Sequence, residues 1–145
     1  MAENEITVYI PGAAVGKGRP KFARRGNFVK TYTPEKTASY ENLVKLAAQQ
    51  AMGGREMMTC PIVVDVTVVV EPPASWSQKK QMAAFQQEIA PDKKPDLDNV
   101  LKALLDACNG VLWGDDKQVV EAHIRKRYGI TPQTMLVAWE WSGNS

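Results

Sequence analysis

The run PIVVDVTVVV at residues 61–70 limits the fold more than any other part of this sequence. Apart from Asp65, apolar or β-branched residues fill both alternating sets of positions, and such residues favour strands. A strand that is apolar on both faces is typical of the interior of a sheet covered on both sides. We therefore expect Pro61–Val70 to be a central, doubly covered strand.

The remaining sequence supplies further strands and helices around this one. Helical spacing of apolar residues predicts one helix that begins after Thr33-Pro34 and ends at Gly53-Gly54, and another over Leu97–Cys108. A polar surface helix is expected over Ser75–Ala90, where Ser75 and Gln78 have capping-box spacing. Alternation predicts strands at Ile6–Ile10, Phe28–Tyr32, Val119–Tyr128 and Thr134–Trp141, and the last two can pair antiparallel across residues 129–133. Strands and helices do not alternate strictly. We expect one α+β domain over residues 1–145, a small mixed sheet packed with two or three helices.

Composition excludes membrane-spanning and disulfide-rich classes. Hydrophobic residues make up 44% and charged residues 23% of the chain, as in ordinary globular proteins. The longest mostly apolar run, Ile62–Val70, is too short to cross a bilayer, and the first five residues are too acidic for a signal peptide. Cys60 and Cys108 have no metal-binding spacing; we expect free buried thiols, with a disulfide left open. The chain is expected in the cytoplasm, with no membrane partner.

The net charge of +2 hides two segments of opposite sign. A basic loop is expected over residues 13–30, and no acidic residue lies between Lys17 and Lys30. A loop of one sign predicts contact with nucleic acid phosphates, and the alternative is an ordinary solvated loop. We favour DNA contact and take as candidates its six basic residues, Lys17, Arg19, Lys21, Arg24, Arg25 and Lys30.

The acidic segment begins at a predicted helix start. Pro95 places Asp96 at the helix cap and Asp98 in the first turn. The apolar stripe of Leu97–Cys108 then points Asp98, Lys102 and Asp106 to the opposite, exposed face. Capping alone accounts for Asp96 and Asp98 unless other acidic groups join them.

A second acidic group follows the helix at Asp115-Asp116. If Val111–Gly114 is extended, it can bring these residues back beside Asp96 and Asp98, although the spacing does not force this. Converging carboxylates would need a cation, and an all-oxygen set suits Mg²⁺ or Mn²⁺. Such a site serves phosphodiester hydrolysis, where Lys102 can orient water or neutralise developing charge.

Residues 94–119, KPDLDNVLKALLDACNGVLWGDDKQV, resemble the signature of the RusA family of Holliday junction resolvases. The shared elements are an Asp-x-Asp-Asn, a lysine four residues after the second Asp, a further Asp on the helix, and Asp-Asp-x-Gln. The N-terminal Lys17–Pro20 and Thr31–Pro34 also resemble phage and prophage branches of the family. The resemblance implies Asp96, Asp98 and Asp116 as metal-binding residues and Lys102 as the catalytic lysine.

The resemblance also implies an endodeoxyribonuclease that acts as a homodimer. Such enzymes cut two strands of a four-way DNA junction in recombination or repair, with Mg²⁺ or Mn²⁺. Asp115 and Gln118 belong to the motif without a clear role, Asp106 is a candidate structural residue, and we add Asp115 to the candidate metal ligands. Two alternatives remain: a branched-DNA-binding protein with a divalent-metal site and no turnover, and an α+β domain with a structural Ca²⁺ or Mg²⁺ site.

Three smaller features give weaker expectations. Trp113 precedes the acidic turn and is expected to support it, whereas Trp139 and Trp141 share a strand face in the core or in a dimer interface. The basic residues 125–127 alternate faces, so they cannot all contact the same DNA. The lone His123 is given no role.

Overall fold

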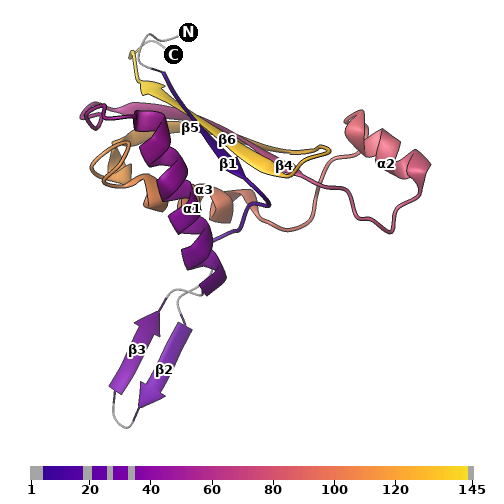
Figure 1. Cartoon of the computed structure of the whole chain (residues 1–145), viewed down its shortest axis with the longest axis horizontal. Coiled ribbons are helices and arrows are strands. Elements are labelled where there is room, and N and C mark those ends of the chain that lie inside the picture. The colour runs from indigo at the N-terminus through magenta and orange to yellow at the C-terminus, as the bar shows by residue number, and fades with distance from the viewer. Residues whose placement is uncertain (1–4, 18–20, 26–27, 33–34, 144–145) are drawn as a thin grey trace.

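The computed structural model describes residues 5–17, 21–25, 28–32 and 35–143, with side chains for residues 5–17 and 35–143 (Figure 1). The elements, in chain order, are β1 (Ile6–Pro11), β2 (Lys21–Arg25), β3 (Phe28–Tyr32), α1 (Glu35–Met52), β4 (Ile62–Val70), α2 (Gln78–Phe85), α3 (Leu97–Cys108), the 3₁₀ turn η1 (Asp116–Gln118), β5 (Val119–Tyr128) and β6 (Gln133–Glu140). A four-stranded mixed sheet with three helices confirms the predicted α+β class.

The sheet has the strand order β1-β6-β4-β5, so β4 is an interior strand as predicted. It pairs antiparallel with β6 and parallel with β5. The expected direct pairing of β5 with β6 is therefore wrong, because β4 lies between them. A parallel neighbour needs a long crossover, and the segment holding α2 and α3 supplies it between β4 and β5.

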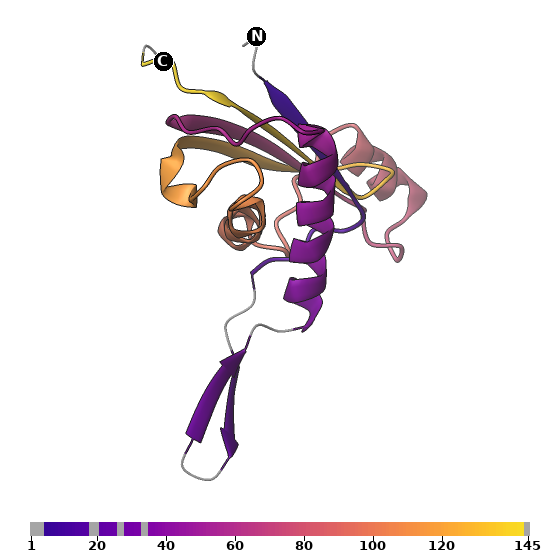
Figure 2. The same cartoon turned by 60° about the vertical axis from the view of Figure 1, so that its left-hand side comes forward.

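Helices α1 and α3 pack together on one face of the sheet and leave the other face open (Figure 2). The covered face of β4 carries Val64, Val66 and Val68, all fully buried. The open face carries Asp65 and Thr67, which are only half-buried. The prediction of a doubly covered strand is thus wrong for one face, where a carboxylate would lose its hydration under an apolar layer.

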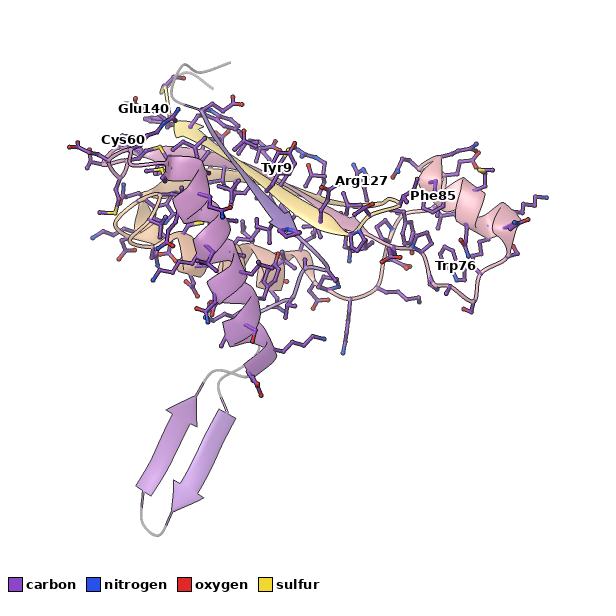
Figure 3. All side chains as sticks on the ribbon, viewed as in Figure 1. Tyr9, Cys60, Trp76, Phe85, Arg127 and Glu140 are labelled. Atoms are coloured by element: carbon purple, nitrogen blue, oxygen red, sulfur yellow. The ribbon has the colours of Figure 1, made fainter. Side chains whose placement is uncertain are left out.

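A polar network and exposed aromatic surface occupy the open face. The Arg125 guanidinium donates to both carboxylate oxygens of Asp65, at 2.7 and 2.9 Å, and to the Thr67 hydroxyl at 2.8 Å. This pairing holds the pKa of the Asp65 carboxyl below its usual value. Tyr9 of β1 and Arg127 of β5, labelled in Figure 3, belong to the same face by their register, and Tyr9 is 62% exposed.

The amphipathic helix α3 forms as predicted. Val100, Ala103, Leu104 and Cys108 are buried against the sheet and α1. Helix α1 ends at Gly53-Gly54, whose φ values of 54° and 92° suit glycine, while its predicted cap Thr33-Pro34 lies outside the described residues. No helix in the described ranges is long and apolar enough to span a membrane.

One predicted helix differs from the structure. Helix α2 is shorter than Ser75–Ala90, and its cap is Ser77, whose hydroxyl accepts from the Lys80 N–H at 3.2 Å. Trp76 sits in a turn before the helix and packs edge-on against Tyr128. Trp76 and Phe85 are labelled in Figure 3.

The predicted basic loop contains a β-hairpin. Strand β2 pairs antiparallel with β3, with Lys21 opposite Tyr32 and Arg25 opposite Phe28. The sequence carried part of this signal, because Gly26-Asn27 is a hairpin dipeptide directly before the β-prone run Phe28–Tyr32. In Figure 1 and Figure 2 the hairpin lies apart from the four-stranded sheet.

Both cysteines are free thiols, as expected. Cys108 is fully buried, and burial raises the pKa of its thiol to about 12. Cys60 is only half-buried, so the expectation of two buried thiols holds for Cys108 alone.

Candidate active site

The amino end of α3 presents Asp96 and Asp98, called here the amino-end pair. The backbone of Asp96 caps the helix, since its carbonyl accepts from the Val100 N–H at 3.0 Å, but its carboxylate makes no capping hydrogen bond. Both carboxylates are exposed. Side-chain capping therefore does not explain Asp96, and its oxygens are available for another partner.

Lys126 fixes the chain just before the amino-end pair. Its ammonium donates to the carbonyl of Pro95 at 2.9 Å and to that of Lys93. Lys126 thus points to the covered face while its neighbours Arg125 and Arg127 lie on the open face, which confirms the predicted alternation. Sequence reasoning gave Lys126 no part in the site, because the contact crosses 31 residues of chain.

Three charged side chains follow one another along the outer face of α3. Asp98, Lys102 and Asp106 are spaced by four residues, so the row extends for about 12 Å at 1.5 Å per residue. Asp98 and Lys102 are exposed, and Asp106 is half-buried. The lysine therefore stands between two carboxylates, one helical turn from each.

The acidic turn, residues 114–118, lies beyond the carboxyl end of α3 and is fixed by Gln118. The Gln118 side-chain oxygen accepts from the N–H groups of Gly114 and Asp115, at 3.0 and 3.1 Å. Its amide nitrogen donates to the carbonyls of Met58 and Cys60, at 2.9 and 3.2 Å. The role that the sequence left open for Gln118 is to bind this turn to the segment before β4.

Trp113 supports the acidic turn as predicted. Its side chain is fully buried, and its indole N–H donates to the Asn109 side chain at 2.9 Å. The N–H of Gly110 donates to the Trp113 carbonyl at 2.7 Å. These bonds fold residues 109–113 into a compact turn, so the extended Val111–Gly114 that would return the chain to the amino-end pair is not formed.

Asp116 instead lies near Asp106, toward the carboxyl end of α3. Burial and hydrogen bonds to Asp106 and Asp115 raise the pKa of the Asp116 carboxyl above its usual value, and the negative charges of these two groups act in the same direction. Asp115 caps η1 by accepting from the Lys117 N–H at 3.0 Å, a bond that lowers the pKa of Asp115. Asp106, which the sequence offered as a structural candidate, therefore lies with Asp115 and Asp116 in one group of carboxyls near the carboxyl end of α3.

Lys17 is the predicted DNA contact whose side chain the structure describes. Its ammonium lies 2.8 Å from a Glu41 carboxylate oxygen on α1 and 3.1 Å from one of Asp106 on α3. The Glu41 hydrogen bond raises the pKa of Lys17. Arg19 lies outside the described residues, and for Lys21, Arg24, Arg25 and Lys30 the structure gives only their places on β2 and β3.

A cavity of about 390 Å³ opens beside the amino-end pair. It lies between the segment after β1, the first turn of α1 and the start of α3. Exposed Lys36 and Lys94 contribute positive charge to its wall. The residues that line it are Ala14, Val15, Gly16, Lys17, Lys36, Lys94, Pro95, Asp96 and Asn99.

The candidate metal ligands fit Mg²⁺ by their chemistry, since all are carboxylates. They are divided between the amino-end pair and the acidic turn. Within the described parts of the chain, no three Asp, Glu, His or Cys side chains converge closely enough to hold one ion. Among the described residues, the candidate ligands therefore form two separate groups.

The family profile of Endodeoxyribonuclease RusA matches residues 11–137, nearly the whole chain. The chain belongs to the RusA family. A curated relative, "Uncharacterized protein YqaN" of Bacillus subtilis (strain 168), is 34% identical over 140 residues, which cover 95% of this chain and 96% of the relative. RusA proteins are endodeoxyribonucleases that act on branched DNA junctions. The matched residues include the amino-end pair, Asp106 and the acidic turn.

Proposed function

We propose that this protein is a Mg²⁺-dependent endonuclease that resolves four-way DNA junctions by paired cuts, with Mn²⁺ as a possible substitute. The proposal places it in the cytoplasm of a bacterial host, encoded by the host or by a phage or prophage. The observation that carries it is the row Asp98, Lys102 and Asp106 on the outer face of α3, which runs from the amino-end pair toward Asp116. Family membership supports the reaction class.

The metal ligands in this proposal are Asp96, Asp98, Asp115 and Asp116. When bound, Mg²⁺ would polarise the scissile phosphate and lower the pKa of a bound water. These carboxylates come from both ends of α3, so we expect substrate and metal to complete the site together. Asp115 already uses one carboxylate oxygen to cap η1, which leaves the other as a ligand.

Lys102 is the catalytic cation of the proposed site. It is exposed midway along the acidic row, and no ion pair engages it within the described part of the chain. Its ammonium is therefore available to a phosphate that lies along α3. A cation in that place would orient the attacking water and offset charge that builds on the phosphate oxygens.

The DNA is proposed to contact α3 and the basic residues of the hairpin. Lys21, Arg24, Arg25 and Lys30 lie on β2 and β3, and Arg19 precedes them in sequence. Lys36 and Lys94 add positive charge beside the amino-end pair. Contact with several phosphates predicts that binding weakens steeply as salt rises.

A homodimer is part of the proposal. Two symmetric cuts across a two-fold junction are most simply made by a two-fold protein that carries two sites. Analytical ultracentrifugation of the free protein and of its junction complex would test this stoichiometry. A single protomer bound to a junction that still receives paired cuts would contradict it.

Incubation with a synthetic four-way junction and Mg²⁺ tests the reaction directly. We expect paired nicks, no nicks in linear duplex of the same arms, and loss of both nicks in Asp98→Asn. Asp92→Asn is the matched control, because Asp92 is an exposed carboxylate in the charged turn before α3. Equal cutting of linear duplex would refute junction selectivity, and tight binding without any cutting would indicate a branched-DNA-binding protein instead.

A further inference from the structure

Lys17 links its own segment to α1 and to α3, the helix that carries Asp98, Lys102 and Asp106. Its ammonium contacts Glu41 of α1 and Asp106 of α3, and its backbone N–H donates to the Asn99 carbonyl at 2.9 Å. The side chains of Lys17, Glu41 and Asp106 are 22%, 18% and 30% exposed. The ammonium is therefore held between two carboxylates that already satisfy its charge.

The backbone that carries Lys17 runs close to α3. A Cβ added at Gly16 would lie 2.9 Å from the Asn99 Cβ, which is closer than real Cβ atoms approach one another. The glycine thus lets the strand-to-hairpin segment pass directly over the first turns of the helix. This contact fixes the point from which the Lys17 side chain reaches along α3 to Asp106.

Asp106 also lies near Asp116, because α3 and η1 pack against each other. Two carboxyl groups in contact repel when both are charged, so a neighbouring cation stabilises the pair. Lys17 is the cation that contacts Asp106. We propose that Lys17 is a positioning residue of the nuclease site, which holds Asp106 against Asp116, and that it does not bind DNA.

This inference rests on the proposed function and replaces the DNA contact that the sequence predicted for Lys17. Lys17 could act as a DNA contact, as a structural link between α1 and α3, or as a positioning residue. Each role predicts a different effect when the side chain is removed. Loss of a DNA contact weakens junction binding, and loss of a structural tie lowers stability alone. Loss of a positioning residue slows the cleavage step of bound junction.

The experiment compares Lys17→Met with Lys17→Arg and with Lys21→Met from the basic hairpin. Junction dissociation constants are measured in an Asp98→Asn background, and cleavage rates are measured at saturating enzyme with Mg²⁺ in the active background. Lys17→Met is expected to slow cleavage about 10- to 100-fold, as removal of groups that orient metal-site ligands does, with junction affinity changed less than about twofold. Lys17→Arg, which keeps both ion pairs, is expected to restore most of the rate.

The control is expected to behave in the opposite way. Lys21→Met should weaken junction binding and reduce the salt dependence of affinity by about one counterion, with the saturated rate unchanged. In an Asp106→Asn background, Lys17→Met should slow cleavage no further, because both changes remove the same contact.

Three results would overturn the inference. Lys17→Met could weaken junction binding as Lys21→Met does, with an unchanged saturated rate. It could lower the melting temperature as much as Glu41→Gln does while the folded variant cleaves normally. If Lys17→Met does not fold, Asp106→Asn, which keeps the Lys17–Glu41 pair, replaces it, and a wild-type rate would refute the inference.

Failure of the proposed function can be recognised separately. A wild-type chain that binds a junction without cutting it refutes the nuclease proposal. The affinities of Lys17→Met and Lys21→Met would still show whether Lys17 contacts DNA, so a weakened Lys17→Met would refute this inference on its own.

Discussion

Asp96 and Asp98 stand exposed at the amino end of α3, whereas Asp106, Asp115 and Asp116 near its carboxyl end are held by other parts of the chain. The amino-end pair has a fixed backbone, and the Asp96 carboxylate makes no cap bond. The acidic turn has a side-chain bond at almost every position, and Gln118 alone makes four. One helix thus presents an exposed acidic group and a preorganised one, with Lys102 between them.

This difference indicates that the two ends of α3 have different roles in the site. Ordered carboxylates lose little side-chain entropy when a ligand binds, whereas exposed ones must be ordered by the ligand. We expect the acidic turn to set the geometry and the amino-end pair to complete it with DNA and metal. Disturbing either group, or the segment that passes between them, should have separable effects on stability and on cleavage.

The largest effect on stability is expected at the preorganised end, from Gln118→Leu. The substitution leaves the N–H groups of Gly114 and Asp115 and two carbonyls of the preceding segment without their partner. At about 1 kcal/mol of net stabilisation for a hydrogen bond, less for the exposed ones, the loss should be about 2–3 kcal/mol. Urea unfolding measures it.

Gln49→Leu is the matched control, because Gln49 is exposed on α1. It should change the free energy of unfolding by less than about 0.5 kcal/mol. A Gln118→Leu variant as stable as this control would show that the acidic turn does not depend on Gln118, and the contrast between the two ends of α3 would lose its basis.

A smaller effect on stability is expected from Gly16→Ala, in the segment that carries Lys17 past Asn99 of α3. The new methyl would meet the Asn99 Cβ at 2.9 Å and push the Lys17 segment away from α3. Overpacking of this kind costs about 1–2 kcal/mol, and we expect slower cleavage as Lys17 moves. Gly114→Ala is the control, since its nearest contact is an ordinary 3.5 Å to Gln118. Equal stability of the two variants, measured by thermal unfolding, would contradict the close passage.

The smallest effect concerns the charge of Asp116, and its sign depends on pH. Because the pKa of Asp116 is raised in the folded state, its ionised form costs folding free energy at neutral pH. That cost disappears as pH falls below the usual carboxyl pKa of 3.8, where the group is protonated in both states. Asp116→Asn should therefore stabilise the protein at pH 7 by only a few tenths of a kcal/mol, because the site is mostly solvated and screened.

Melting temperatures of wild type and Asp116→Asn across this pH range provide the measurement. The gain should be present near neutral pH and absent in acid, while the same substitution abolishes cleavage. A variant that is less stable than wild type at pH 7 would contradict this, because it would show that the ionised Asp116 carboxylate stabilises the folded state.

Local patterns in the sequence were sufficient for most of the fold. The period of apolar residues gave α3 and its buried face, and the β-branched run gave β4 as an interior strand. The pairing of β4 between β5 and β6 was not predictable from such patterns, because it depends on where a long crossover returns. The open face of β4 had one signal, Asp65, whose partner Arg125 is 60 residues away.

For the site, too, local sequence patterns predicted the residues but not their long-range contacts. The residue types and the cap position of Asp96 followed from local rules, whereas the place of Asp116 depended on a buried turn around Trp113 that brings it to Asp106 instead of the amino-end pair. Lys17 looked like a phosphate contact because every charged residue from Lys17 to Lys30 is basic. Its carboxylate partners lie 24 and 89 residues further along, beyond the range of any local pattern.

Single-turnover cleavage of a four-way junction by Asp98→Asn, Asp116→Asn and the double variant tests the central claim that both ends of α3 form one nuclease site. If they act as one unit, each single substitution should slow cleavage by at least about 100-fold, and the double variant should be no slower than the worse single one. Junction affinity should stay near that of wild type throughout. Either single variant cutting at close to the wild-type rate, or losses that multiply in the double variant, would contradict the claim.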